Sequence, residues 1–124
     1  MAKSIKHILK STGTYRVNGS LWIEFNENHF FGPGRVELLE RIDQTGSINQ
    51  AAKQMGMSYK KAWEMITMLN TQGKKPLVIL QVGGESGGGS KITDEARELI
   101  SFHRLLRKRF TAFLKKETRN LLHV

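Results

Sequence analysis

The segment from Gly46 to Asn70 constrains the fold of this 124-residue chain more than any other part of it. Ser47 stands where a helix N-cap belongs, and Gln50 three residues later completes a capping box of the Ser-x-x-Gln kind. Gly56 suits the left-handed conformation that ends a helix, and Ser58 can cap the next one. The segment therefore predicts two short helices that meet at a tight glycine turn.

The second of these helices, at about residues 58–71, has one apolar and one polar face. Ala62, Ile66 and Leu69 recur at helical spacing and are expected to point inward. The exposed start of the helix then carries Tyr59 and Lys60, which are hydrogen-bonding and cationic groups. This arrangement is typical of a helix-turn-helix whose recognition helix enters a DNA major groove. An ordinary helical hairpin has the same pattern, so the flanking sequence has to decide between the two.

The charge of the chain favours an anionic partner. The net charge is +9 and the isoelectric point is about 10.1, with the excess spread over the helical parts rather than confined to a tail. Such a field attracts polyanions, meaning nucleic acid or an anionic membrane face. The chain has no cysteine, which excludes disulfides and thiolate metal sites.

The size and the N-terminus predict a single cytoplasmic domain. No apolar run approaches the roughly 20 residues that span a bilayer. The first residues contain lysines but lack the apolar core of a signal peptide. We expect a flexible basic N-terminus over residues 1–12 and one domain over residues 13–124.

Strand and helix patterns flank the central segment on both sides. Residues 14–25 alternate between apolar and polar around Asn18-Gly19, which predicts an N-terminal β-hairpin. An amphipathic pattern predicts a helix over residues 33–45. After the recognition helix come an apolar strand over 77–82, a glycine-rich loop over 83–90 and a short return strand over 91–93. Asp94 lies at the start of a long final helix.

Together these elements predict an α+β fold, a winged helix-turn-helix with an N-terminal β-hairpin, a Gly-rich wing hairpin and a long C-terminal dimerisation helix. Apolar residues of the last helix recur at alternating spacings of three and four, as in a heptad seam. The expected dimer contacts on this seam are Leu99, His103, Leu106, Phe110 and Phe113.

The sequence resembles the N-terminal DNA-binding domain of the ModE family of molybdate-responsive regulators, whose winged helix is related to that of LysR-type regulators. The resemblance covers about residues 20–115. It is carried by the following motifs: Arg35–Leu39 with Ile42, Gly46-Ser47-Ile48, Ala52-Lys53, Gly56, Ser58-Tyr59-Lys60 with Ala62-Trp63, the glycine wing, and Leu99-Ile100.

The resemblance implies a homodimeric bacterial transcription regulator on a palindromic operator. The candidate DNA contacts are Ser47, Asn49, Gln50, Ser58, Tyr59, Lys60, Lys61, Trp63, Glu64, Thr67 and Lys91. The wing glycines are Gly83, Gly84, Gly87, Gly88 and Gly89. Regulators of this type sense molybdate through C-terminal domains that would begin where this chain ends, at Val124. We therefore expect a stand-alone DNA-binding form with no molybdate site and no cofactor.

The sequence offers no catalytic constellation, so an enzyme is not expected. The four histidines are scattered without metal-ligand spacing, and the glycine-rich loop lacks the Lys-Ser/Thr of a phosphate-binding loop. The basic residues of the last helix, such as Arg107 and Lys115, are interpreted as its solvated side, with contact to a partner left open. The alternative function is a non-catalytic basic adaptor or an RNA-binding interaction module.

Overall fold

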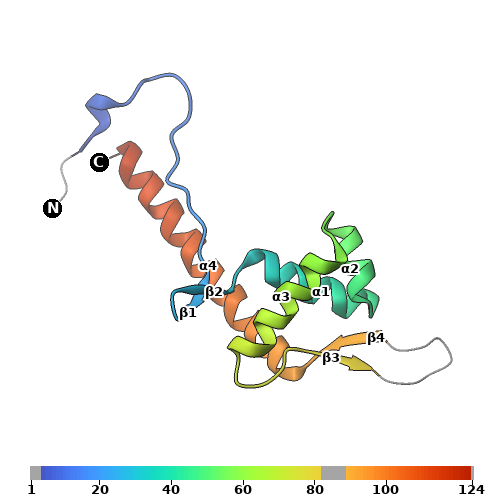
Figure 1. Cartoon of the computed structure of the whole chain (residues 1–124). Coiled ribbons are helices and arrows are strands. Elements are labelled where there is room, and N and C mark those ends of the chain that lie inside the picture. Colours follow the sequence, from blue (N-terminus) through green and yellow to red (C-terminus); the bar gives the residue numbers. More distant parts are fainter. Residues whose placement is uncertain (1–3, 82–88, 124) are drawn as a thin grey trace. The chain divides into compact units, whose positions relative to one another are not determined.

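The computed structural model describes residues 4–81 and 89–123. The chain forms two compact units: a terminal unit, made of residues 1–21 and 104–124, and a central unit, made of residues 22–103. Figure 1 shows the elements in their order along the chain. They are η1 (Lys6–Ile8), β1 (Ile23–Phe25), β2 (Asn28–Phe31), α1 (Pro33–Thr45), α2 (Ile48–Gln54), α3 (Tyr59–Gln72), β3 (Val78–Gln81), β4 (Gly89–Ile92) and α4 (Asp94–His123).

Helix α1 forms over the range that the sequence predicts. Pro33 occupies the first turn, where its missing N–H has no helical partner to lose. Leu38, Leu39 and Ile42 are fully buried along one face. The helix ends at Gly46, whose φ of 68° is left-handed and whose N–H donates to the Ile42 carbonyl oxygen at 2.7 Å.

The two short helices that follow are capped as predicted. The Ser47 hydroxyl accepts the Gln50 N–H, and the Ser58 hydroxyl accepts the Lys61 N–H, each at 3.0 Å. Gly56 ends α2 with a φ of 67°. The reciprocal half of the predicted capping box does not form, because the Ser47 N–H donates to Thr45 Oγ1 at 3.2 Å. Thr45, the last residue of α1, therefore accepts the Ser47 N–H that the Gln50 side chain was expected to accept.

The N-terminal hairpin exists, but the prediction of its turn at Asn18-Gly19 is wrong. The turn lies at Asn26 and Glu27, which both have left-handed φ values, of 49° and 68°. Strands β1 and β2 pair antiparallel on either side of it. Gly19 serves a different need, because a Cβ there would lie 3.3 Å from Cζ of Phe110. Its lack of a side chain lets extended backbone lie against an aromatic ring.

The second hairpin follows the prediction more closely. Strands β3 and β4 pair antiparallel with Val78 opposite Ile92 and Gln81 opposite Gly89. Four of the predicted wing glycines, Gly83, Gly84, Gly87 and Gly88, lie outside the described residues. Three helices followed by this hairpin make an α+β arrangement that is compatible with a winged helix-turn-helix.

One apolar core holds the central unit together. Its buried side chains come from every helix of the unit, from β2 and from the second hairpin. The members are Phe31, Leu38, Leu39, Ile42, Ile48, Ala51, Ala52, Ala62, Ile66, Leu69, Leu77, Val78, Ile92, Ala96 and Ile100. His103 of α4 is only 3% exposed and meets the Phe31 ring edge-on, with ring centres 5.6 Å apart.

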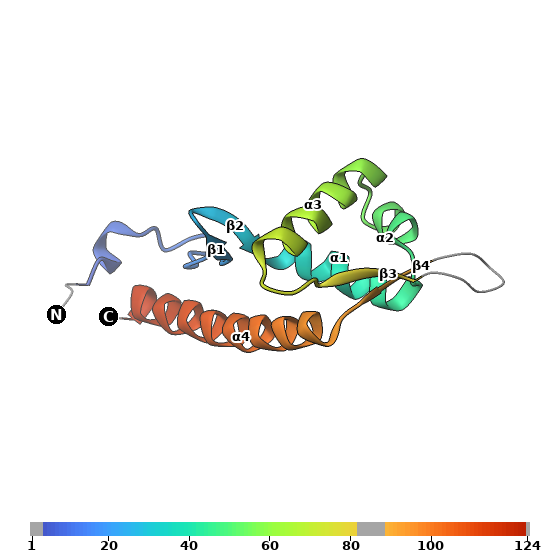
Figure 2. The same ribbon diagram turned by 60° about the horizontal axis from the view of Figure 1, so that its bottom comes forward.

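The second hairpin is held directly against the turn between α1 and α2. The Ser90 N–H donates to the Gly46 carbonyl oxygen at 2.9 Å. A Cβ on Gly89 would lie only 2.8 Å from the same oxygen. In both ribbon views the N-terminal end of β4, where Gly89 and Ser90 lie, is beside the C-terminal end of α1 (Figures 1 and 2). Backbone thus packs on backbone at this point, with no room for a side chain.

We predict that Gly89→Ala destabilises the fold by about 1–3 kcal/mol, because the added methyl group forces the two backbones apart. Denaturant unfolding followed by circular dichroism measures the effect. Gly34→Ala is the control: its Cβ meets no atom within 4 Å, and in helix α1 alanine is expected to add about 0.5–1 kcal/mol of stability. Equal stability of the two variants would contradict the proposed contact.

Candidate nucleic-acid interface

Helix α3 presents a polar face and buries an apolar one, as predicted. Ala62, Ile66 and Leu69 are buried in the core. The opposite face is exposed at the positions that the sequence analysis selected. These exposed residues are Tyr59, Lys60, Lys61, Glu64 and Thr67. An exposed polar surface therefore runs from the start of α3 to Thr67.

Trp63, one of the expected DNA contacts, also contacts the hydrophobic core. Its side chain is half-buried and packs against the apolar core. It also meets the ring of Tyr59 edge-on, with ring centres 6.1 Å apart. The core thus holds the indole ring of Trp63 in place, while Tyr59, in the first turn of α3, stays exposed.

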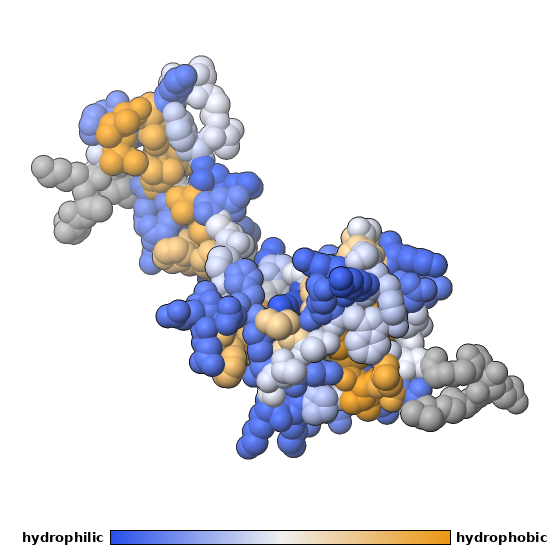
Figure 3. Space-filling view, viewed as in Figure 1, coloured by the Kyte–Doolittle hydropathy of each residue, from blue (hydrophilic) through white to orange (hydrophobic). Residues whose placement is uncertain are grey.

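A groove of about 530 Å³ joins the start of α3 to the start of α2 and to the loop-side ends of β3 and β4. The residues that line it are Gly46, Ser47, Ile48, Asn49, Tyr59, Trp63, Leu80, Gln81, Gly89 and Ser90. Apolar side chains gather over the hairpin on the face shown in Figure 3, beside a largely hydrophilic surface. The groove brings together hydroxyl and amide groups and exposed aromatic surface from three separate elements.

The groove contains some of the predicted site residues and not others. Ser47, Asn49, Tyr59 and Trp63 line it together with the wing residue Gly89. The remaining predicted contacts are exposed without lining it: Gln50, Ser58, Lys60, Lys61, Glu64, Thr67 and Lys91.

Sequence reasoning missed five residues of the groove: Gly46, Ile48, Leu80, Gln81 and Ser90. Leu80 and Gln81 come from β3. The apolar run at 77–82 predicted a strand but did not indicate which side chains face outward, and Leu80 is 60% exposed. The antiparallel register pairs Leu80 with Ser90 and Gln81 with Gly89, both of which line the groove. Knowing that register in advance would have identified the pair.

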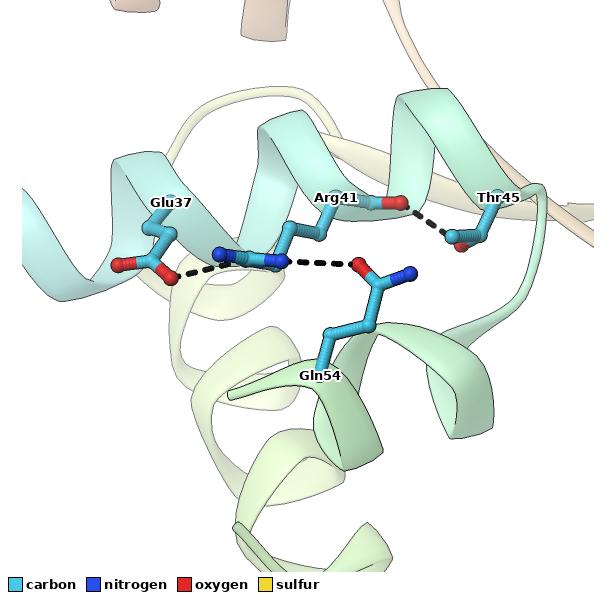
Figure 4. Close-up of polar contacts among 4 residues, drawn as sticks. All are labelled: Glu37, Arg41, Thr45 and Gln54. Carbon is cyan, nitrogen blue, oxygen red and sulfur yellow. Dashed lines mark hydrogen bonds and ion pairs between the residues drawn. The ribbon is translucent and has the colours of Figure 1, made fainter. Parts of the chain in front are cut away.

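An arginine fixes α2 against α1 beneath this surface (Figure 4). Arg41 Nε donates to Glu37 Oε2 at 2.8 Å, and Arg41 Nη1 donates to Gln54 Oε1 at 3.0 Å. One turn on, the Thr45 hydroxyl donates to the Arg41 carbonyl oxygen at 2.7 Å. The guanidinium therefore links the two helices that support α3.

The amide of Asn70 fixes the second hairpin to the last turn of α3. Asn70 Oδ1 accepts the N–H groups of Leu77 and Val78 at 2.8 and 3.2 Å. Asn70 Nδ2 donates to the Val78 carbonyl oxygen at 3.0 Å. The side chain pairs with the strand as a neighbouring strand would, so α3 and the hairpin are held in one register.

Two further arginines brace the central unit. Arg35 Nη1 donates to the carbonyl oxygens of His29 and Phe30 at 2.9 and 2.7 Å, and partial burial lowers the pKa of its guanidinium. Arg97 makes a two-point contact with Asp43, at 2.9 and 3.0 Å. The hydrogen bonds and charge of Asp43 raise the Arg97 pKa. By contrast, Lys60, Lys61 and Lys91 make no ion pair within the part of the chain that the structure describes.

Other kinds of site were sought in the same residues. Within residues 4–81 and 89–123, no three His, Asp or Glu side chains lie together as a metal site would require. None of the described helices combines the length and the apolarity that crossing a membrane would need.

Comparison with known proteins supports a relationship to the ModE family. No family model matches the chain. The chain is 39% identical over 90 residues to the molybdenum transport protein ModE of Azotobacter vinelandii, a match covering 73% of this chain and 33% of that protein. It is 41% identical over 88 residues to the transcriptional regulator ModE of Haemophilus influenzae, covering 71% and 34%.

A third relative is the DNA-binding transcriptional dual regulator ModE of Escherichia coli, which is 38% identical over 86 residues, covering 69% of this chain and 33% of that protein. The chain thus spans about a third of the length of these relatives.

We predict that Asn70→Ala weakens the attachment of the second hairpin to α3. The change leaves two half-buried N–H groups and one carbonyl without their partner, at a cost of about 1–3 kcal/mol in unfolding free energy. Chemical denaturation measures it. Thr71→Ala is the control, because the Thr71 hydroxyl bonds only to carbonyls of its own helix. If both variants unfold at the same denaturant concentration as the wild type, the amide does not hold the hairpin.

Proposed function

We propose that this chain is a DNA-binding transcription regulator that reads its operator with α3. The observation that carries the proposal is the groove in which the start of α3, the start of α2 and the loop-side ends of β3 and β4 meet. A helix-turn-helix exposes the first turns of its second helix to base edges, and α3 exposes hydrogen-bonding and cationic side chains there. The relatives named as transcriptional regulators support the same conclusion.

Within this proposal the residues of α3 have distinct roles. Tyr59 and Lys60 contact base edges from the first turn, and Glu64 does so one turn later. Ser58 and Lys61 hold phosphates, as hydroxyl and ammonium groups commonly do in protein–DNA complexes. The hairpin acts as a wing, with Lys91 contacting the DNA backbone.

The N-terminal part of α2 and the middle of α3 complete the proposed interface. Ser47, Asn49 and Gln50 lie at or next to the start of α2, where Ser47 and Asn49 line the groove. Thr67 extends the exposed face of α3 by a further turn. The RNA-binding alternative is not proposed, because the relatives are named as transcriptional regulators.

Two adjacent lysines allow base readout and phosphate contact to be separated. Lys60→Ala is expected to relax sequence preference, because a good contact to a base edge is worth about 1–3 kcal/mol of discrimination. Lys61→Ala is expected to weaken binding to all sequences alike and to reduce the salt dependence by about one unit of slope. Fluorescence anisotropy on a selected site and on random duplex, at several salt concentrations, measures both effects. Wild-type behaviour of both variants would show that α3 is not the reading helix.

We further propose that the regulator is a homodimer that contacts its copy through α4. Two recognition helices about 34 Å apart would match successive major grooves of a palindrome. Leu99 and His103 of the predicted seam already pack in the chain's own core. Phe110 is half-buried and lies against the backbone of Gly19 in the same chain. Leu106 is half-buried and Phe113 is 53% exposed, so the contact is proposed to centre on these two residues.

The variant Phe113→Glu is expected to convert the dimer to monomer, because it places like charges opposite each other across a two-fold axis. Sedimentation velocity measures the change. Phe25→Glu is the control, since Phe25 is 46% exposed and belongs to β1 of the central unit, which is not part of the proposed contact. The dimer proposal fails if wild-type protein is monomeric both free and on DNA, or if folded Phe113→Glu sediments as the wild type does.

A further inference from the structure

The positive charge of this chain is concentrated in the terminal unit. That unit holds eleven of the 20 Lys and Arg residues but only one of the 11 acids, Glu117, which gives it a net charge of +10. The remaining nine cations and ten acids belong to the central unit, whose net charge is −1. The unit that contains the proposed reading helix thus has no excess of positive charge.

The cations of the two units also differ in their contacts. In the central unit, Arg41, Arg97 and Lys75 pair with carboxylates at 2.8, 2.9 and 3.7 Å. In the terminal unit, the side chains of Arg107 and Lys115 make no ion pair or hydrogen bond with any residue in the described ranges, and the same holds for the side chains of Arg16 and Arg119. These four charges are therefore available to an outside partner.

These four cations surround one groove of about 440 Å³. The extended N-terminal segment forms one wall and α4 the other, held together by the Val17 N–H, which donates to Thr118 Oγ1 at 3.0 Å. The backbone at Gly19 lies against the Phe110 ring. Val17, Phe110 and Leu114 give the groove an apolar lining between Arg16, Arg107, Lys115 and Arg119.

The positive charge continues along the same helix beyond this groove. A second hollow of about 450 Å³ is lined by Arg104, Lys108 and Ala112, together with Arg107, Thr111 and Lys115, which also line the first groove. Cations spread along a helix do not converge on a single point, as a site for one small anion would require. Spread charge of this kind fits a polymer with phosphates at regular intervals.

We propose that the terminal unit is a second DNA-binding surface, which contacts backbone phosphates and supplies the sequence-independent attraction that the central unit lacks. This inference rests on the proposed DNA-binding function. Neutralising phosphates releases condensed counterions, and this release drives non-specific binding to duplex. Base contacts from α3 then select among sequences that the terminal unit has already brought close.

The test neutralises three groove cations in the full chain, as Arg107→Gln, Lys115→Gln and Arg119→Gln together. Binding to random and to selected duplex is followed across a series of salt concentrations. The slope of log Kobs against log salt is expected to fall by up to about 2.7, at about 0.9 per lost phosphate contact. The ratio of specific to non-specific affinity is expected to stay unchanged.

The matched control removes the same number of charges from the central unit, as Arg41→Gln, Lys75→Gln and Arg97→Gln. These cations are already paired with acids, so the slope is expected to stay near that of the wild type. Thermal unfolding confirms that both triple variants are folded. An equal fall in slope for both variants overturns the inference, because net charge alone would then explain it.

Three other outcomes also overturn the inference. One is a wild-type slope for the groove variant. A second is a loss of binding confined to single-stranded RNA or to phosphatidylglycerol vesicles. A third is saturable displacement of the anionic dye anilinonaphthalene sulfonate by a small anion, with duplex binding unchanged. If Lys60→Ala still alters sequence preference in any of these cases, the proposed role as a DNA-binding regulator is retained and only the role of the terminal unit is rejected. If the wild-type protein does not bind duplex DNA, the proposed function itself fails.

Discussion

The turn at Gly46 is the constraint on which the rest of the central unit depends. Its left-handed φ of 68° ends α1 and sets the direction in which α2 begins. Its carbonyl oxygen, which helix formation leaves free, accepts the Ser90 N–H and excludes a side chain from Gly89. One residue thus positions α1, α2 and the loop-side end of β4 against one another. The groove proposed to face DNA forms around this junction.

Elements whose ends are set by local chemistry were predictable from sequence. Ser47 and Ser58 cap helices, and Gly56 ends one, through contacts within a few residues of themselves. The N-terminal hairpin was placed wrongly because Asn18-Gly19 has the composition of a turn, yet Gly19 is needed for its close approach to Phe110. That approach joins residues 91 positions apart, so no pattern in a short window could have revealed it.

The candidate site was predictable in its helical half only. Spacing along α3 identifies which residues face outward, but Leu80 and Gln81 join the groove through strand register and through the contact at Gly46. The charge division was hidden for a similar reason. Along the chain the excess is divided between the two ends, with +4 in residues 1–21 and +6 in residues 104–124, and folding brings these two segments together in one unit. Tertiary contact, rather than composition, therefore decides where the basic surface lies.

The amide of Asn70 has a consequence for how this protein can change over evolution. Because a side chain, and not the connecting loop, sets the register between α3 and β3, the length of the connection carries little positional information. Residues 74 and 75 are exposed, and an insertion between them would bulge into solvent while the strand kept its phase relative to the helix. The length of this loop can therefore change without altering the geometry of the proposed DNA-reading surface. A substitution of Asn70, by contrast, removes the hydrogen bonds that set the position of β3 relative to α3.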